Sequence, residues 1–254
     1  MIVTTAAPFN SGIKMKSTRI RRIFRIVLKL FAGIILLSVV AAVIAHLAWK
    51  YSGTGKPELV IDRNGVKVYT IKASGDSLLK VMATRRVDTT MDQAIAAMID
   101  DRVENCHDWN PNCFGSKAVK PWDPKTLSYV QLWTQSTRSP FKTREYLLGV
   151  KVTQNPSDKS ATVQFHEIPD LLPENDCCVR VRYMRNRWIF KPLDAKGIEV
   201  NLLLDMDIGI PYFLFNSRSP EGVYGTFEDL PRLFNSPRYD NAKLDWLIAT
   251  EPRK

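Results

Sequence analysis

Two runs of alternating residues, joined by a turn signal at residues 194–197, extend from Cys178 to Asp207. This pattern is typical of a half-buried antiparallel β-hairpin. Cross-strand neighbours share a face, so one face of the hairpin is charged and the other is bulky and mostly apolar. The bulky face contains Arg182, Met184, Asn186, Trp188, Phe190, Val200, Leu202, Leu204 and Met206. The pattern predicts either part of a solid core or one wall of a ligand cavity.

Six further strands are predicted by runs of the same kind, over residues 58–62, 66–72, 78–87, 127–135, 144–153 and 161–167. The period changes to that of a helix at Met91–Ile99, where Thr90 and Gln93 predict a capping box. Residues 105–122 are rich in turn residues, and residues 168–173 read as a loop. The mixture of elements predicts an α+β domain.

The tail of the chain opens at Ile210-Pro211, and proline suits a first helical turn. An apolar stripe at helical spacing follows, made of Val223, Phe227, Leu230 and Phe234. Two glycines and Pro231 weaken a single continuous helix, so we expect two pieces or one kinked helix. Residues 238–246 are expected to form a short final turn or helix.

A run of 19 residues near the start, Leu30 to Ala48, contains no Asp, Glu, Lys or Arg. At about 1.5 Å per residue, such a helix spans ~28 Å, close to the hydrocarbon core of a bilayer. Basic residues precede it, and the positive-inside rule places that side in the cytoplasm. We therefore expect a basic cytoplasmic segment (1–29), a transmembrane anchor (30–49), a linker (50–57) and an extracytoplasmic domain (58–250), periplasmic if the source is bacterial. A cleaved signal peptide is the alternative, and it also exports the domain.

The net charge of +10 belongs mainly to this N-terminal region. Eight of the 36 Lys and Arg residues lie in residues 1–50, which contain no acid, so 28 bases face 26 acids in the rest. The domain is nearly neutral, which argues against a nucleic-acid partner, because phosphate binding needs a basic face.

The four cysteines are too few for a disulfide scaffold, and their spacing fits no zinc site. Cys106 and Cys113 flank a turn-rich segment and either pair in an oxidising compartment or remain buried thiols. Adjacent residues on a strand point to opposite faces, so a bond between Cys177 and Cys178 is not expected. We find no nucleophile, phosphate-loop, dinucleotide or zinc-protease motif, so no enzyme, cofactor or metal is predicted.

Several short motifs occur in an order that resembles the START lipid-binding domains of the helix-grip superfamily. They lie at residues 108–113 (DWNPNC), 139–145 (SPFKTRE), 168–170 (IPD), 179–180 (VR), 188–192 (WIFKP) and 209–216 (GIPYFLFN). The resemblance covers roughly residues 58–236. It implies a curved antiparallel sheet around a C-terminal helix, with an internal cavity for one lipid or other hydrophobic molecule.

The resemblance also implies a set of ligand-binding residues on the hairpin and the tail helix. They are Arg182, Met184, Asn186, Trp188, Leu202, Leu204, Met206, Val223, Phe227 and Leu230. Arg182 is the candidate for a head-group contact, with a water-exposed rim position as the alternative. Arg144 is expected to anchor its strand by hydrogen bonds. Gln131 and Val150 stand about where sterol-carrying relatives bury an acid–base pair, so that pair is not carried over.

These observations predict a membrane-anchored protein that binds a hydrophobic ligand and can transfer it. One alternative is an enzyme like the polyketide cyclases and aromatases, which use polar groups in the same kind of cavity. The apolar hairpin face argues against it. Another is a structural module of an envelope complex that holds a hydrophobic segment of a partner.

Overall fold

The computed structural model describes residues 12–100, 102–193 and 197–248 and forms two compact units, which meet in the sequence at Tyr51 and Ser52. Most of the predicted turn at residues 194–197, the first eleven residues of the basic segment and the end of the predicted domain lie outside these ranges.

The first unit contains one long helix, α1 (Gly12–Tyr51). Its stretch Ile20–Tyr51 is apolar and long enough to cross a membrane, and its large apolar side chains are exposed. A helix of this kind near an N-terminus suits either a membrane span or a signal sequence.

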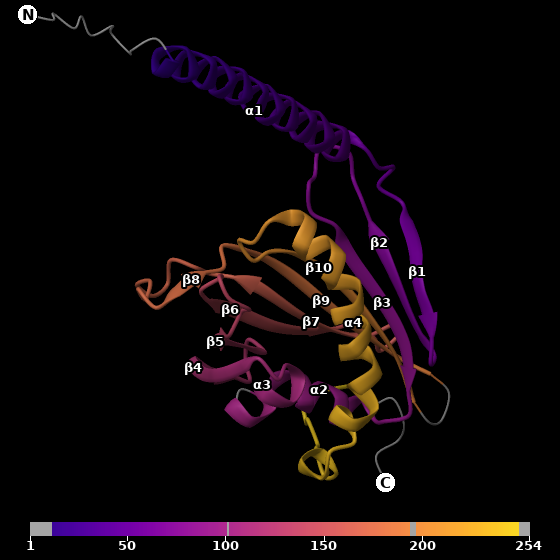
Figure 1. Ribbon diagram of the computed structural model, residues 1–254. Coiled ribbons are helices and arrows are strands. Elements are labelled where there is room, and N and C mark those ends of the chain that lie inside the picture. Colours follow the sequence, from indigo (N-terminus) through magenta and orange to yellow (C-terminus); the bar gives the residue numbers. More distant parts are fainter. Residues whose placement is uncertain (1–11, 101, 194–196, 249–254) are drawn as a thin grey trace, which may run out of the picture. The chain divides into compact units, whose positions relative to one another are not determined.

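The second unit is built on a ten-stranded sheet with the order β1-β2-β3-β10-β9-β7-β6-β5-β4, antiparallel along this path (Figure 1). A short strand, β8, pairs with β6 in parallel. The strands are β1 (Pro57–Arg63), β2 (Val66–Ile71), β3 (Lys80–Val87), β4 (Cys113–Asp123), β5 (Ser128–Gln135), β6 (Thr143–Gln154), β7 (Ala161–Glu167), β8 (Cys178–Arg180), β9 (Tyr183–Pro192) and β10 (Ile198–Asp207). The six strands predicted before the hairpin are all present.

The region 105–122, which carried no predicted element, contains most of the helix α3 (Val103–Trp109) and most of β4. β4 lies at the edge of the sheet, and within the described part of the chain its one partner strand is β5, with several register shifts. Most of its side chains are only partly buried or exposed. Without a buried face it has little apolar alternation, which is why its pattern is weak.

The tail forms one helix, α4 (Tyr212–Phe234), which lies across one face of the sheet (Figure 1). The helix is continuous through Pro220 and Pro231, so of the two expected forms, two pieces or one kinked helix, the two-piece form is wrong. Tertiary contacts hold the helix together: Arg85 donates hydrogen bonds to the carbonyls of Phe227 and Glu228. Packing of this kind overrides local propensity. A short 3₁₀ helix, η1 (Pro237–Tyr239), follows.

The capping box predicted at the start of helix α2 (Met91–Ile99) is confirmed. The Thr90 hydroxyl accepts a hydrogen bond from the Gln93 backbone N–H, and the Gln93 side chain accepts one from the Thr90 N–H. We expect Thr90→Ala to lower the free energy of unfolding by about 1 kcal/mol. Chemical denaturation of the full chain measures this, and Thr90→Ser, which keeps the hydroxyl, is the control. Equal loss in both variants would contradict the capping role.

Candidate functional site

A cavity of about 570 Å³ lies between the sheet and α4. Its wall is mainly apolar and aromatic, with side chains from β5, β7, β9 and β10 on the sheet side and from α4 on the other. Four of the lining residues are exposed, and they mark where the cavity reaches the surface: Arg138, Leu214, Arg218 and Gly222. A site of this volume and character is typical of pockets for drug-sized molecules.

Seven of the residues proposed from the sequence line this cavity: Met184, Asn186, Trp188, Leu202, Leu204, Met206 and Val223. The strand register explains the agreement. Asn186 is paired with Leu204 and Trp188 with Leu202, so their side chains share one face of the sheet. That face is covered by α4.

Phe227 and Leu230 are fully buried but are not among the lining residues. The Phe227 ring stacks on Trp188, with 5.4 Å between ring centroids. The Trp188 ring is therefore shared between the cavity wall and the solid core. The stripe on α4 that was expected to cover the cavity belongs in part to the core behind it.

Arg182 does not line the cavity, which corrects its placement on the bulky face of the hairpin. It lies between β8 and β9, outside both strands, so the alternation does not extend to it. Its exposed guanidinium forms ion pairs with Asp170, at 3.2 Å, and with Glu174. Of the two sequence-based alternatives for this residue, the water-exposed position is the one observed.

Other lining residues were missed in the sequence. On the sheet side they include Trp133 and Phe165, whose ring centroids are 5.8 Å apart. The strands of both residues were predicted. The alternation of Tyr129, Gln131 and Trp133 along β5 could have assigned Trp133 to the inner face. Phe141 and Phe215 lie in segments without alternation, so no simple pattern marks them.

Three polar atoms of the lining residues are buried and have no hydrogen-bond partner among the described residues: Trp133 Nε1, Asn186 Oδ1 and Ser219 Oγ. The only ionisable side chains among the described lining residues are Arg138 and Arg218 at the surface. The cavity therefore combines an apolar wall with a few uncharged polar groups.

A buried ion pair supports one end of the sheet. Arg180 donates two hydrogen bonds to the Glu145 carboxylate, at 2.7 and 2.9 Å, and the two side chains are 2% and 6% exposed. The same guanidinium donates to the carbonyls of Pro169, Leu172 and Pro173. Arg180 thus fastens the loop that follows β7 to β6.

Comparison with known proteins gives structural matches only. Neither a protein-family model nor a curated protein matches the sequence. A solved STAR-related lipid transfer protein from Xanthomonas axonopodis has a TM-score of 0.64 and 23% identity, over 71% of this chain and 99% of its own. Human STARD10 has a TM-score of 0.61 and 13% identity, over 74% and 76% of the two chains. Human StAR-related lipid transfer protein 5 has a TM-score of 0.60 and 14% identity, over 80% and 97%.

The second unit has the START-type helix-grip fold. The fold implied by the sequence motifs, a curved antiparallel sheet gripping a C-terminal helix, is confirmed. Several of the motif residues are structural in this START-type unit. The Asn216 side chain accepts a hydrogen bond from the Leu79 N–H and donates one to the Ser77 carbonyl, which fixes the start of α4 beside β3.

Arg144 of the START-type unit anchors its strand, as expected. Its buried guanidinium donates hydrogen bonds to the carbonyls of Ile208 and Gly209, at 2.5 and 3.1 Å, and to that of Lys142. Gln131 and Val150 are both fully buried and uncharged. Neither lines the cavity.

All four cysteines are in disulfides. Cys106 is bonded to Cys113, which is one of the two states left open by the sequence. Cys177 is bonded to its neighbour Cys178, contrary to our expectation. That expectation placed both residues on a strand, but β8 begins at Cys178 and Cys177 lies in the preceding turn. Strand alternation therefore does not separate their side chains.

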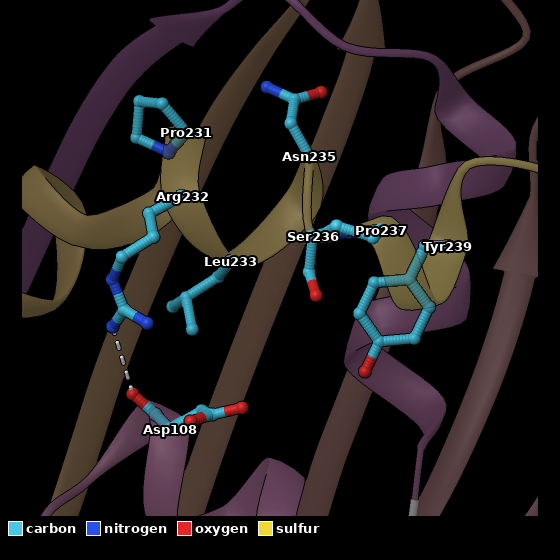
Figure 2. A pocket seen from close by; sticks show the side chains of 8 residues that line it. All are labelled: Asp108, Pro231, Arg232, Leu233, Asn235, Ser236, Pro237 and Tyr239. Carbon is cyan, nitrogen blue, oxygen red and sulfur yellow. Dashed lines mark hydrogen bonds between the residues drawn. The ribbon is translucent and has the colours of Figure 1, made fainter.

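A second, smaller pocket of about 300 Å³ lies between Asp108 and the C-terminal end of α4. Figure 2 shows its lining side chains, with Arg232 donating a hydrogen bond to the Asp108 carbonyl at 3.3 Å. Asn235 also donates a hydrogen bond to the Asp88 carbonyl, and the Tyr239 hydroxyl donates one to the Asp100 carboxylate. The polar groups of this pocket thus serve to hold the end of α4, and we assign it no ligand.

The Asp100 carboxylate beside this pocket titrates below the ordinary range. Burial alone raises its pKa, but hydrogen bonds from the Arg102 and Tyr239 side chains outweigh burial and lower the pKa. The folded pKa is below the unfolded one, so the stabilisation is complete above the ordinary value of about 3.9 and is lost as pH falls through the lowered value. We expect Asp100→Asn to weaken the pH dependence of the unfolding free energy below about pH 4, measured by denaturation at each pH. An unchanged dependence would contradict this assignment.

Proposed function

We propose that this protein binds one lipid, or a hydrophobic molecule of similar size, in the cavity under α4. The observation that carries the proposal is the cavity itself, a site of about 570 Å³ with a mainly apolar wall. Two of the structural neighbours reported above are named as lipid transfer proteins, which supports the same role.

The energetics favour an enclosed apolar ligand. A lipid that hides about 400 Å² of apolar surface gains ~10 kcal/mol at about 25 cal/mol per Å². Only a site enclosed on several sides captures most of that gain, and here the sheet and α4 enclose the ligand between them. Part of the gain offsets the lost freedom of the ligand.

We further propose that residues 30–49 anchor the protein to a membrane, with the N-terminus in the cytoplasm and the domain on the other side. The exposed apolar helix Ile20–Tyr51 and the basic residues before it support this arrangement. A tether of this kind would keep the cavity close to a source of lipid. Transfer of the bound lipid between that membrane and a partner is the activity we propose.

A binding role fits the cavity better than catalysis. Acid–base and nucleophilic catalysis depend mainly on His, Asp, Glu, Lys, Cys or activated Ser side chains. Among the described lining residues, the ionisable ones are the two surface arginines. The unpaired Ser219 hydroxyl has no histidine or carboxylate beside it in the cavity wall.

Titration of the full chain in detergent with cis-parinaric acid, a fatty acid that fluoresces strongly in dry surroundings, tests the proposal. We expect a saturable rise in fluorescence with one probe per chain, and displacement of the probe by unlabelled lipid. Fluorescence equal to that of a protein-free detergent blank would contradict lipid binding.

A further inference from the structure

The three polar atoms left without partners in the cavity wall indicate the chemistry of its ligand. We infer that the cavity selects a molecule with an apolar body and one uncharged hydrogen-bonding group, a hydroxyl or an amide, placed beside Asn186. The inference rests on the proposed lipid-binding function and adds to it the chemical class of the polar end.

Asn186 occupies the middle of the wall. It lies on β9, and the strand register pairs it with Phe165 on β7 and with Leu204 on β10. The Phe165 ring in turn contacts the Trp133 ring, at 5.8 Å between centroids. The buried indole N–H of Trp133 and the side-chain amide of Asn186 therefore flank the same apolar residue, Phe165, on the inner face of the sheet.

The opposite wall contributes one more group of the same kind. Ser219 lies on α4 and lines the cavity, and its buried hydroxyl oxygen has no partner among the described residues. By contrast, the neighbouring polar residue Thr226 is satisfied within the helix, because its hydroxyl donates to the Gly222 carbonyl. The unpaired groups are thus particular residues, and not a general feature of polar positions on this wall.

The donor and acceptor types define what would satisfy these atoms. An indole N–H can only donate, an amide oxygen accepts, and a serine hydroxyl does both. A purely apolar ligand leaves all of them buried and unpaired, which is unfavourable. A ligand hydroxyl or amide both donates and accepts, so it can satisfy either kind of group, including the acceptor oxygen of Asn186. A carboxylate or a fully ionised phosphate cannot donate to the Asn186 oxygen, and the described lining residues include no buried cationic side chain.

The two surface arginines are the competing recognition element. Arg138 and Arg218 are exposed residues of the cavity lining and would favour an anionic group at the mouth. Exposed charges are screened by water and salt, whereas the unpaired groups are buried, so we expect the buried groups to dominate selectivity.

Three probes that share one chain and differ at one end test the inference: hexadecane, 1-hexadecanol and hexadecyl phosphate. Each competes with cis-parinaric acid for the full chain in the same detergent. We expect 1-hexadecanol to bind about 10-fold more tightly than hexadecane and more tightly than hexadecyl phosphate. Asn186→Leu, which keeps the size of the side chain but removes its amide, should bring the alcohol-to-alkane ratio close to one.

Control variants separate selectivity from folding. Asn201→Leu makes the same change on the outer face of β10, where Asn201 donates to Glu199, and should leave the ratio unchanged. If Asn186→Leu does not fold, Trp133→Phe and Ser219→Ala take its place in the test. Each of them removes one polar atom and should lower the alcohol-to-alkane ratio. Equal binding of alcohol and alkane by the wild-type protein, or tightest binding of the phosphate, would overturn the inference but leave lipid binding intact. Failure of all three probes to compete, with no saturable binding of cis-parinaric acid, would overturn both.

Discussion

Removal of one partner of the buried Glu145–Arg180 ion pair is expected to lower the free energy of unfolding by about 3–5 kcal/mol. The two side chains are 6% and 2% exposed, so the remaining charge stays in a site with almost no water. Arg180→Met has a second effect, because it also removes the donor for the carbonyls of Pro169, Leu172 and Pro173. Denaturant unfolding of the full chain, followed by tryptophan fluorescence, measures the loss.

The neighbouring arginine provides a matched control for this prediction. Arg182 also forms two ion pairs, but its side chain is 58% exposed. Arg182→Met should therefore lower the free energy of unfolding far less than Arg180→Met does. The double variant Glu145→Leu/Arg180→Met should lose less than the sum of the single losses, because neither charge is then left unpaired. Single variants within about 1 kcal/mol of the wild type would contradict the structural role of the pair.

Gly222→Trp is expected to reduce ligand affinity about 70-fold while the protein remains folded. Gly222 lines the cavity, and a Cβ atom built on it meets no other atom within 4 Å. An indole there would displace about 100 Å² of ligand contact, or ~2.5 kcal/mol at about 25 cal/mol per Å². Replacing a helical glycine also favours the helix by up to about 1 kcal/mol.

Gly225 of the same helix is the control, because a Cβ atom there also meets nothing within 4 Å, although Gly225 is not a lining residue. Gly225→Trp should bind cis-parinaric acid like the wild type, and thermal unfolding should show both variants folded. Equal affinities of the two variants would show that the ligand does not occupy the space in front of Gly222.

The hairpin shows how far alternation alone can predict a site. Its period of two correctly assigned Met184, Asn186, Trp188, Leu202, Leu204 and Met206 to one inner face, and that face lines the cavity. It failed at Arg182, where the break between β8 and β9 ends the strand. Short breaks of this kind depend on which neighbour the strand pairs with, and that information is not local.

The features that the sequence did not predict depend on tertiary contacts. The edge strand β4 has little apolar alternation because most of its side chains are not buried. The helix α4 is continuous through Pro220 and Pro231, and Arg85 of β3 donates hydrogen bonds to its Phe227 and Glu228 carbonyls from the sheet. The unpaired state of Asn186, Trp133 and Ser219 is a property of the packed cavity. The sequence shows these residues as polar but cannot show which of them lack partners.

Native mass spectrometry of the full chain, purified in detergent without added lipid, tests the central claim most directly. The account predicts a main species that carries one bound molecule per chain, and a bound mass that matches a lipid with an uncharged polar end. It also predicts that Gly222→Trp loses this species and Gly225→Trp retains it. A wild-type protein that carries no ligand, and that takes up none when 1-hexadecanol is added, would contradict the account.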